Sequence, residues 1–201
     1  MGFETLSGKL DVALNVLCSC VVFLFIVTSA PVSQFRGKGM KADANNVVTG
    51  ASKLACVTVW GLKNDCSKNN YEYRPADMGC SKVSSLFKVS EAFYIIAALT
   101  TCAATVLGGM FFIGFKSKVL LYVLTVLNIA FTLIPWACMT GVWYKDYCGG
   151  SSVAINTENG NVAGIPYGKQ LRDNFKTSAA YGLTVSAFCI QIIGLILLCV
   201  M

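Results

Sequence analysis

The chain has 201 residues, of which 55% are hydrophobic and 13% are charged, and its mean hydropathy is +0.63. This composition lies outside the range of ordinary soluble domains and is typical of polytopic membrane proteins. The net charge of +6 comes from basic residues scattered among acids and aromatics, without a basic helix or run, so we expect no nucleic-acid partner.

The residue types needed for common catalytic sites are sparse. The sequence has no histidine, which removes the commonest general base, pH switch and metal ligand. It also contains no zinc-type cysteine pair and no glycine-rich phosphate loop. We therefore expect a non-enzymatic protein with no catalytic residues, no cofactor and no metal.

Four apolar stretches are long enough to cross a hydrocarbon core of about 30 Å, which takes about 20 residues of helix. The first, residues 12–30, could also be a cleaved signal peptide. It exceeds the usual length of a signal core, and Pro31 follows directly, so we expect a retained span. None of the four contains Asp, Glu, Lys or Arg, which argues against a pump or a proton-coupled transporter. The spans are expected at residues 12–30, 92–115, 119–144 and 178–201.

The most informative segment of the first loop, residues 31–91, runs from Cys56 to Cys66. The alternation over residues 55–62 predicts a strand, with Cys56, Thr58 and Trp60 on one face. We interpret Trp60 as a hydrophobic plug between sheet and bundle, and expect Lys63, Asn64 and Asp65 to face solvent. The segment reads Cys56, Val57, Thr58, Val59, Trp60, Gly61, Leu62, Lys63, Asn64, Asp65 and Cys66.

The rest of the loop and the spans give further expectations. A helical pattern at residues 84–91 runs into the second span. Residues 116–118 separate the second span from the third, which forces an antiparallel helical hairpin.

Small residues at helical spacing on two of the spans predict close packing of the helices. They are Ala97, Thr101, Ala104 and Gly108 on the second span, and Ser178, Gly182 and Ser186 on the fourth.

Three spans carry a polar residue with a long side chain: Asn15, Asn128 and Gln191. These side chains could hydrogen-bond across the bundle and contribute roughly 1 kcal/mol each. A polar pore lining is the alternative interpretation.

The second loop, residues 145–177, contains a predicted hairpin. Apolar residues at 153–155 and 162–165 flank Asn159-Gly160, a strong turn signal. Four of the ten cysteines lie in the loops, an even set that suits disulfides in an oxidising compartment. Four cysteines allow three pairings. The loop cysteines are Cys56, Cys66, Cys80 and Cys148.

Two signals disagree on orientation. Thirteen Lys and Arg lie in the two loops, which by the positive-inside rule favours cytoplasmic loops. The cysteines favour the opposite, and the rule weakens for a loop of about sixty residues. We expect both loops to be extracellular and both termini to be cytoplasmic.

The segment from Cys56 to Cys66 resembles, position for position, the signature of the amastins, four-span surface proteins of kinetoplastid parasites. The resemblance implies a multi-pass plasma-membrane protein forming a single amastin-like domain, residues 1–201. It also implies a role in host or membrane contact, adhesion or surface organisation. The alternative is an auxiliary subunit of a channel or transporter, or a channel-like ion or proton conductor.

The large first loop is also similar to that of the claudin and peripheral myelin superfamily, in which a Gly-Leu-Trp element and two cysteines anchor an antiparallel sheet. This chain departs from that pattern, because Trp60 precedes Gly-Leu and Lys63 stands where claudins carry a second Trp. By analogy with claudins, Cys66 would pair with Cys80, leaving Cys56 for Cys148.

The expected fold is therefore a membrane α-helical protein, a four-transmembrane helix bundle with a small disulfide-braced extracellular β-sheet, claudin-like in architecture. The expected partners are the lipid bilayer and an unknown protein or glycan that binds the extracellular loops. A homo-oligomer or a larger membrane complex is a further expectation. Neither loop contains an Asn-x-Ser/Thr acceptor, which argues against N-glycosylation.

Overall fold

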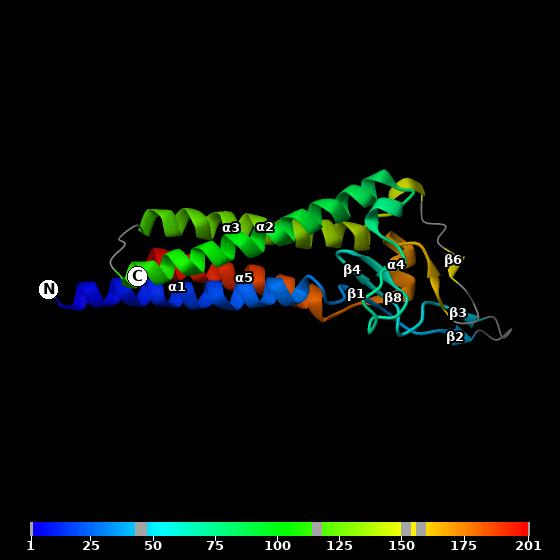
Figure 1. Cartoon of the computed structure of the whole chain (residues 1–201), viewed down its shortest axis with the longest axis horizontal. Helices are drawn as coiled ribbons and strands as arrows, with labels where there is room; N and C mark the ends of the chain where they lie inside the picture. The colour runs from blue at the N-terminus through cyan, green and yellow to red at the C-terminus, as the bar shows by residue number, and fades with distance from the viewer. Residues whose placement is uncertain (1, 43–47, 114–117, 150–153, 156–159, 201) are drawn as a thin grey trace. The chain divides into compact units, whose positions relative to one another are not determined.

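The computed structural model describes residues 2–42, 48–113, 118–149, 154–155 and 160–200 (Figure 1). The chain divides into two compact units. The helical unit comprises Met1–Thr28, Phe93–Ile134 and Leu183–Met201, and the sheet unit comprises Ser29–Ala92 and Pro135–Gly182.

Within the described residues, four helices are long and apolar enough to cross a membrane: α1 (Gly2–Ser29), α2 (Ser81–Phe112), α3 (Lys118–Tyr144) and α5 (Ala179–Val200). The predicted fold class with its four membrane helices is confirmed, and these helices imply a lipid bilayer. The predicted span bounds stay a prediction. The helix predicted at residues 84–91 is the start of α2. The predicted turn between the second and third spans lies mostly outside the described residues.

Three of the four apolar helices extend beyond the predicted spans, and their ends carry ionisable residues. The range Leu10–Ser29 includes Asp11, Ser81–Phe112 includes Lys82, Lys88 and Glu91, and Lys118–Gly149 includes Lys118, Lys145 and Asp146. These residues all lie outside the predicted stretches 12–30, 92–115 and 119–144, which are free of charged residues.

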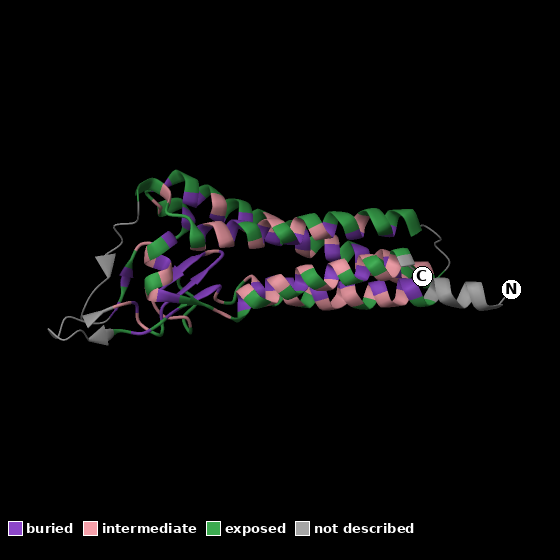
Figure 2. Cartoon of the chain, turned by 180° about the vertical axis from the view of Figure 1, so that it is seen from behind, coloured by how far each residue is buried: buried purple, intermediate pink, exposed green. Residues whose placement is uncertain are grey.

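In the helical unit, each helix buries residues spaced alternately three and four apart. A repeat of about 3.5 residues is the pattern of helices that pack with a left-handed twist. Figure 2 shows the resulting buried positions at intervals along the helices. The residues at this spacing are Val12, Asn15, Ser19, Val22 and Ile26 on α1; Tyr94, Ala97, Thr101, Ala104 and Gly108 on α2; Leu121, Thr125, Asn128 and Thr132 on α3; and Thr184, Ala187, Gln191 and Gly194 on α5. Asp11 on α1, next to Val12, is buried as well.

These interior positions are mostly small or polar, while large apolar side chains such as Leu99, 66% exposed, face outward. This is the distribution expected in lipid, where apolar surface gains nothing by facing inward. Gly108 permits close packing, since a Cβ there would lie 2.1 Å from Cγ2 of Val16. On α5 the predicted stripe is wrong: Gly182 and Ser186 are exposed, because the buried face follows Thr184, Ala187 and Gln191 instead.

The centre of the sheet unit is a four-stranded antiparallel sheet of order β5-β4-β1-β8. Its strands are β1 (Phe35–Gly37), β4 (Cys56–Thr58), β5 (Gly61–Lys63) and β8 (Phe175–Thr177). Since β8 comes from the second loop and the others from the first, both loops build one sheet.

Two short hairpins, two 3-10 turns and a short helix complete the sheet unit. One hairpin pairs β2 (Lys41–Ala42) with β3 (Val48–Thr49). The other pairs β6 (Ala154–Ile155) with β7 (Val162–Ala163), where the sequence predicts a hairpin, although Asn159 of the predicted turn lies outside the described residues. The remaining elements are η1 (Pro75–Asp77), η2 (Tyr147–Gly149) and α4 (Gly168–Asn174).

The sheet unit has an apolar core that combines both loops with the adjoining turns of α2 and α3. Phe35 of β1 is fully buried and stacks on Trp143, with 4.8 Å between ring centroids. The core is made of Phe35, Ala51, Ala55, Val57, Leu62, Cys80, Val83, Phe87, Met139, Val142, Val162, Ile165, Tyr167, Leu171 and Phe175.

The four loop cysteines form two disulfides, Cys56–Cys66 and Cys80–Cys148, with Cα–Cα distances of 5.6 and 6.0 Å. The pairing taken from the claudin analogy is therefore wrong. After β5 the chain folds back, so that the Cys66 amide donates to the Leu54 carbonyl at 2.8 Å, close to Cys56. Cys80 directly precedes α2 and Cys148 follows α3, so the second bridge joins the ends of two neighbouring helices.

Candidate functional site

The signature segment is a hairpin rather than one strand. Strands β4 and β5 pair with Cys56 opposite Lys63, and the chain turns at Val59 and Trp60. The hydroxyl of Thr58 accepts a hydrogen bond from the Trp60 amide at 3.2 Å and donates one to the Gly61 carbonyl at 3.2 Å. The Ser/Thr position of the signature thus closes the turn, and the predicted alternation fails because the chain reverses direction inside it.

Gly61 lies where no larger residue fits. Its φ of +141° is disfavoured for side-chain-bearing residues, and a Cβ there would lie 2.3 Å from the Tyr73 carbonyl oxygen. That carbonyl accepts a hydrogen bond from the Leu62 amide at 2.9 Å, so the segment around Tyr73 runs along the outer edge of β5. The glycine therefore permits this close approach.

Lys63 does not face solvent as predicted. It is only 8% exposed, and its Nζ lies 4.6 Å from the centroid of the Tyr71 ring, a cation–π contact. The prediction is wrong because the segment of Tyr71 and Tyr73 covers β5.

Asn64 and Asp65 are partly buried and organise the loop after β5. The Asn64 side-chain oxygen accepts a hydrogen bond from the Val162 amide at 3.0 Å, which links the signature to the second loop. Asp65 accepts hydrogen bonds from the hydroxyl of Ser67 at 2.7 Å and from its amide at 3.0 Å. These bonds, the hydroxyl first, hold the pKa of Asp65 below its usual value.

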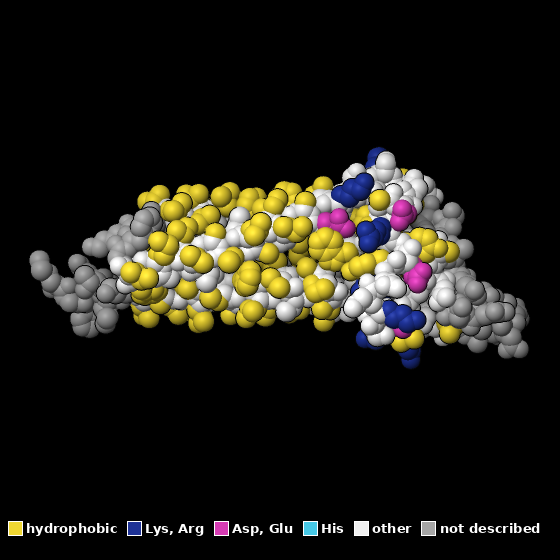
Figure 3. Space-filling view, viewed as in Figure 1, with side chains coloured by type: hydrophobic (Ala, Val, Ile, Leu, Met, Phe, Trp, Pro, Cys, Tyr) yellow, Lys and Arg dark blue, Asp and Glu magenta, His cyan; other side chains and the backbone are white. Residues whose placement is uncertain are grey.

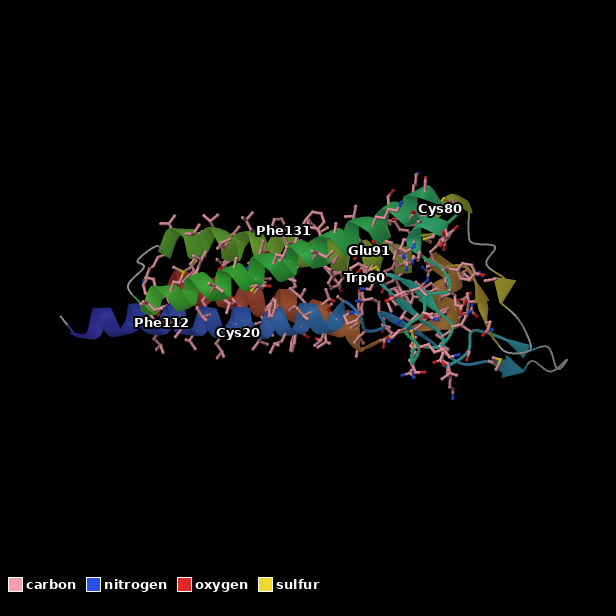
Figure 4. All side chains as sticks on the ribbon, viewed as in Figure 1. Cys20, Trp60, Cys80, Glu91, Phe112 and Phe131 are labelled. Carbon is pink, nitrogen blue, oxygen red and sulfur yellow. A yellow bond between two sulfur atoms is a disulfide. The ribbon has the colours of Figure 1, made fainter. Side chains whose placement is uncertain are left out.

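A pocket of about 440 Å³ lies beside the hairpin turn, within the sheet unit, and Figure 4 labels two of its residues, Trp60 and Glu91. This Trp60 pocket draws on three stretches of chain: the β4–β5 turn, the segment through η1, and α2. Its volume falls in the range of about 300–1,000 Å³ typical of small-molecule sites. It is lined by Trp60, Tyr71, Arg74, Pro75, Ala76, Lys88 and Glu91.

The pocket combines aromatic rings with charges of both signs. Trp60 and Glu91 are partly buried, whereas Arg74 and Lys88 are exposed, and both cations act electrostatically on the Glu91 carboxylate. Among the described residues, Arg172 and Asp146 form the ion pair whose atoms lie within 4.0 Å of each other. Neither Arg74 nor Lys88 forms an ion pair with a described residue. In Figure 3 the Lys, Arg, Asp and Glu side chains in view gather on the sheet unit.

The sequence offers no local signal for this pocket. Trp60 is partly buried and lines the cavity, and its role as a plug between sheet and bundle stays a prediction. Tyr71, Arg74, Lys88 and Glu91 belong to no recognisable motif, and they meet because the chain after β5 folds back along the hairpin and then enters α2.

The three polar span residues lie inside the helical unit, each at most 1% exposed. Asn15 donates through Nδ2 to the Gly194 carbonyl at 3.1 Å and so links α1 to α5. Both polar atoms of Asn128 and Nε2 of Gln191 have no hydrogen-bond partner among the described residues. Within the same described ranges, no cluster of three or more Cys, Asp or Glu could hold a metal ion.

These features define a class: a four-span membrane protein whose two large interhelical loops fold into one disulfide-bonded sheet. A family profile described as Amastin surface glycoprotein matches residues 20–198, and the chain belongs to this family. Searches of curated proteins and of solved structures returned no significant match.

Proposed function

We propose that this member of the amastin family is a non-enzymatic plasma-membrane protein with residues 31–91 and 145–177 outside the cell, both termini inside, and the whole chain acting as one domain. Its extracellular loops contact host or neighbouring membranes, or organise the surface, through a protein or glycan partner. The observation that carries the proposal is the sheet built from both loops and braced by two disulfides. Disulfides persist in oxidising compartments, which supports extracellular loops against the positive-inside rule.

The orientation is tested by labelling intact cells with a membrane-impermeant amine reagent. Lys68 and Lys169 are exposed and lie one in each loop, so both should be modified without permeabilisation. Lys63 serves as an internal control, because its burial predicts slow labelling in the folded protein. If Lys68 and Lys169 were labelled only after permeabilisation, both the proposed orientation and the proposed role would be contradicted.

The contact role is tested with proteoliposomes that carry the full-length chain. They should adhere to cultured host cells more than empty liposomes do, and mild reduction of the disulfides should remove the difference. Equal adhesion of loaded and empty liposomes, with the loops outward, would contradict the role while leaving the orientation intact.

A second candidate function, a channel-like ion or proton conductor or an auxiliary channel subunit, is favoured by the polar interior of the helical unit. Asp11 is 1% exposed, and its Oδ1 has no hydrogen-bond partner among the described residues. The same holds for Oδ1 of Asn15 and for both side-chain polar atoms of Asn128. Buried ionisable and polar groups in spans commonly mark ion pathways.

A measurement of ion or proton flux in liposomes distinguishes a conductor from a protein with a contact role. If the protein conducts, liposomes holding the full chain alone should dissipate an imposed ion or proton gradient, and Asn128→Leu or Gln191→Leu should stop the flux. Absence of flux, together with copurification of a larger channel, would favour the auxiliary-subunit form instead.

A further inference from the structure

We infer that the Trp60 pocket binds the zwitterionic headgroup of a phospholipid, a phosphate diester linked to a quaternary ammonium. This inference goes beyond the proposed contact role and does not depend on it. It rests on the groups that line the cavity and on where α2 becomes apolar.

The phosphate is assigned to the two cations. Arg74 lies just before η1 and Lys88 lies on α2, and both side chains are exposed at the pocket. A guanidinium can hold two phosphate oxygens at once, and an ammonium adds a compact point charge. Because neither cation is held in an ion pair among the described residues, both are available to a ligand.

The quaternary ammonium is assigned to Trp60 and Glu91. A quaternary ammonium is attracted to the face of an aromatic ring, and tryptophan gives the strongest such contact. Tyr71 already has Lys63 at its ring, 4.6 Å from the centroid, so Trp60 is the pocket's main aromatic surface for a new cation. The Glu91 carboxylate supplies the opposite charge.

The presence of Glu91 decides between a zwitterion and a simple anion. A purely anionic ligand held by Arg74 and Lys88 would face the Glu91 carboxylate at close range, and like charges that lie close together repel. A ligand with one negative and one positive group satisfies all three side chains.

The source of the headgroup follows from the sequence of α2. Glu91 is followed by residues 92–112 of the same helix without a single charged side chain. The hydrocarbon region therefore begins directly after Glu91, and the polar headgroups of the bilayer lie at the level of the residues before it. A lipid of the membrane that α2 enters is thus the nearest source of the ligand.

The test is a titration of the purified full-length protein in a maltoside detergent, which has neither phosphate nor ammonium, followed by tryptophan fluorescence. The probes are dihexanoyl phosphatidylcholine, glycerophosphocholine, inorganic phosphate and choline. We expect saturable binding of both phosphocholine compounds, tighter for the lipid, and much weaker binding of phosphate or choline alone.

The variants assign the ends of the ligand. Glu91→Gln and Lys88→Ala should each weaken phosphatidylcholine binding by about tenfold or more, the usual effect of losing a charge-assisted contact. Lys82→Ala is the matched control, because Lys82 is an exposed lysine on the same helix outside this pocket. Thermal unfolding of each variant checks that it is folded.

Three outcomes would overturn the inference. Phosphate binding as tight as glycerophosphocholine binding would make the pocket a simple anion site. Wild-type affinity in folded Glu91→Gln would remove the ammonium assignment. Equal affinity for glycerophosphocholine and the lipid would exclude a membrane lipid as the source. None of these results bears on adhesion of the loops, so the two proposals fail separately.

Discussion

At the scale of single residues, the signature preserves a backbone geometry. The Thr58 hydroxyl closes the β4–β5 turn from both sides, and Gly61 lets the Tyr73 carbonyl reach the Leu62 amide. Neither residue needs to touch a partner for its identity to matter. The Thr58 hydroxyl and the absence of a side chain at Gly61 together allow the turn that carries Trp60, which lines the pocket.

Replacing Gly61 by alanine should destabilise the sheet unit. An alanine would have to hold φ near +141° and place its Cβ 2.3 Å from a backbone oxygen. Such backbone strain costs about 1–3 kcal/mol, and the overlap adds to it. Gly61→Ala should therefore lower the melting temperature of the purified protein. Gly79→Ala is the control, since a Cβ there meets no described atom within 4 Å. Equal melting temperatures for the two variants would contradict this account.

Lys63 is expected to contribute to stability, because it is buried against Tyr71. Lys63→Ala removes the cation–π contact, which is worth roughly 1–2 kcal/mol in a largely desolvated setting. Its free energy of unfolding in denaturant should fall by that amount, whereas Lys68→Ala, at an exposed position of the same loop, should have no measurable effect. If the two variants unfold alike, the lysine is a surface residue in solution.

At the scale of elements, the two disulfides differ in the length of chain they close. The Cys56–Cys66 bridge spans a sequence separation of 10, and the Cys80–Cys148 bridge one of 68. The chain-entropy relation gives about 2.8 and about 4.4 kcal/mol for loops of these sizes. The longer bridge also clamps the start of α2 to the residues after α3.

Removing the bridges pairwise should therefore give unequal effects. The double variant Cys80→Ser with Cys148→Ser should lose more stability, and more surface expression, than Cys56→Ser with Cys66→Ser. Both cysteines of a bridge are replaced together, so that no unpaired thiol remains to form a new disulfide. Peptide mapping of the wild type without reduction should find the same two pairs. A Cys66–Cys80 peptide would contradict the pairing described here.

Two asparagines inside the helical unit should respond in opposite ways when each is replaced by leucine. Asn15→Leu should lose roughly 0.6–1 kcal/mol, because its bond to the Gly194 carbonyl disappears. Asn128→Leu should leave stability unchanged or raise it by about 1 kcal/mol, because its two buried polar atoms have no partner among the described residues. Unfolding by dodecyl sulfate in mixed micelles measures both. A loss in Asn128→Leu would show that a water or an ion satisfies that side chain.

Sequence reasoning was accurate where the signal is local. Four uncharged apolar runs located the spans, and Asn-Gly between two apolar segments located the β6–β7 hairpin. It failed where the path of the chain after an element decides the contact: Lys63 is covered by Tyr71 because the chain folds back along β5, and β1 pairs with β8 at the far end of the second loop. The claudin-like disulfide pairing is wrong because the chain after β5 folds back and brings Cys66 beside Cys56, which leaves Cys80 for Cys148.

At the scale of the whole molecule, orientation can be tested by creating a glycosylation acceptor. Glu72→Thr places an Asn-x-Thr acceptor at Asn70, and both positions are exposed in the first loop. If that loop is extracellular, the variant should gain a glycan that a glycan-removing enzyme takes off. The wild type, which has no such acceptor in its loops, should not change in mobility. An unmodified variant at normal surface level would argue for cytoplasmic loops.

The pairing of β1 with β8 also constrains the order of events during synthesis. Phe35 of β1 leaves the ribosome long before its partner Thr177, which emerges after α3 and just before α5. Until then β1 is an edge strand, and its free edge is open to pairing with other chains. The sheet can close only after residues 175–177 of the second loop have left the ribosome. Chains that stall after α3 should therefore be captured by chaperones, and they should aggregate through the exposed edge of β1.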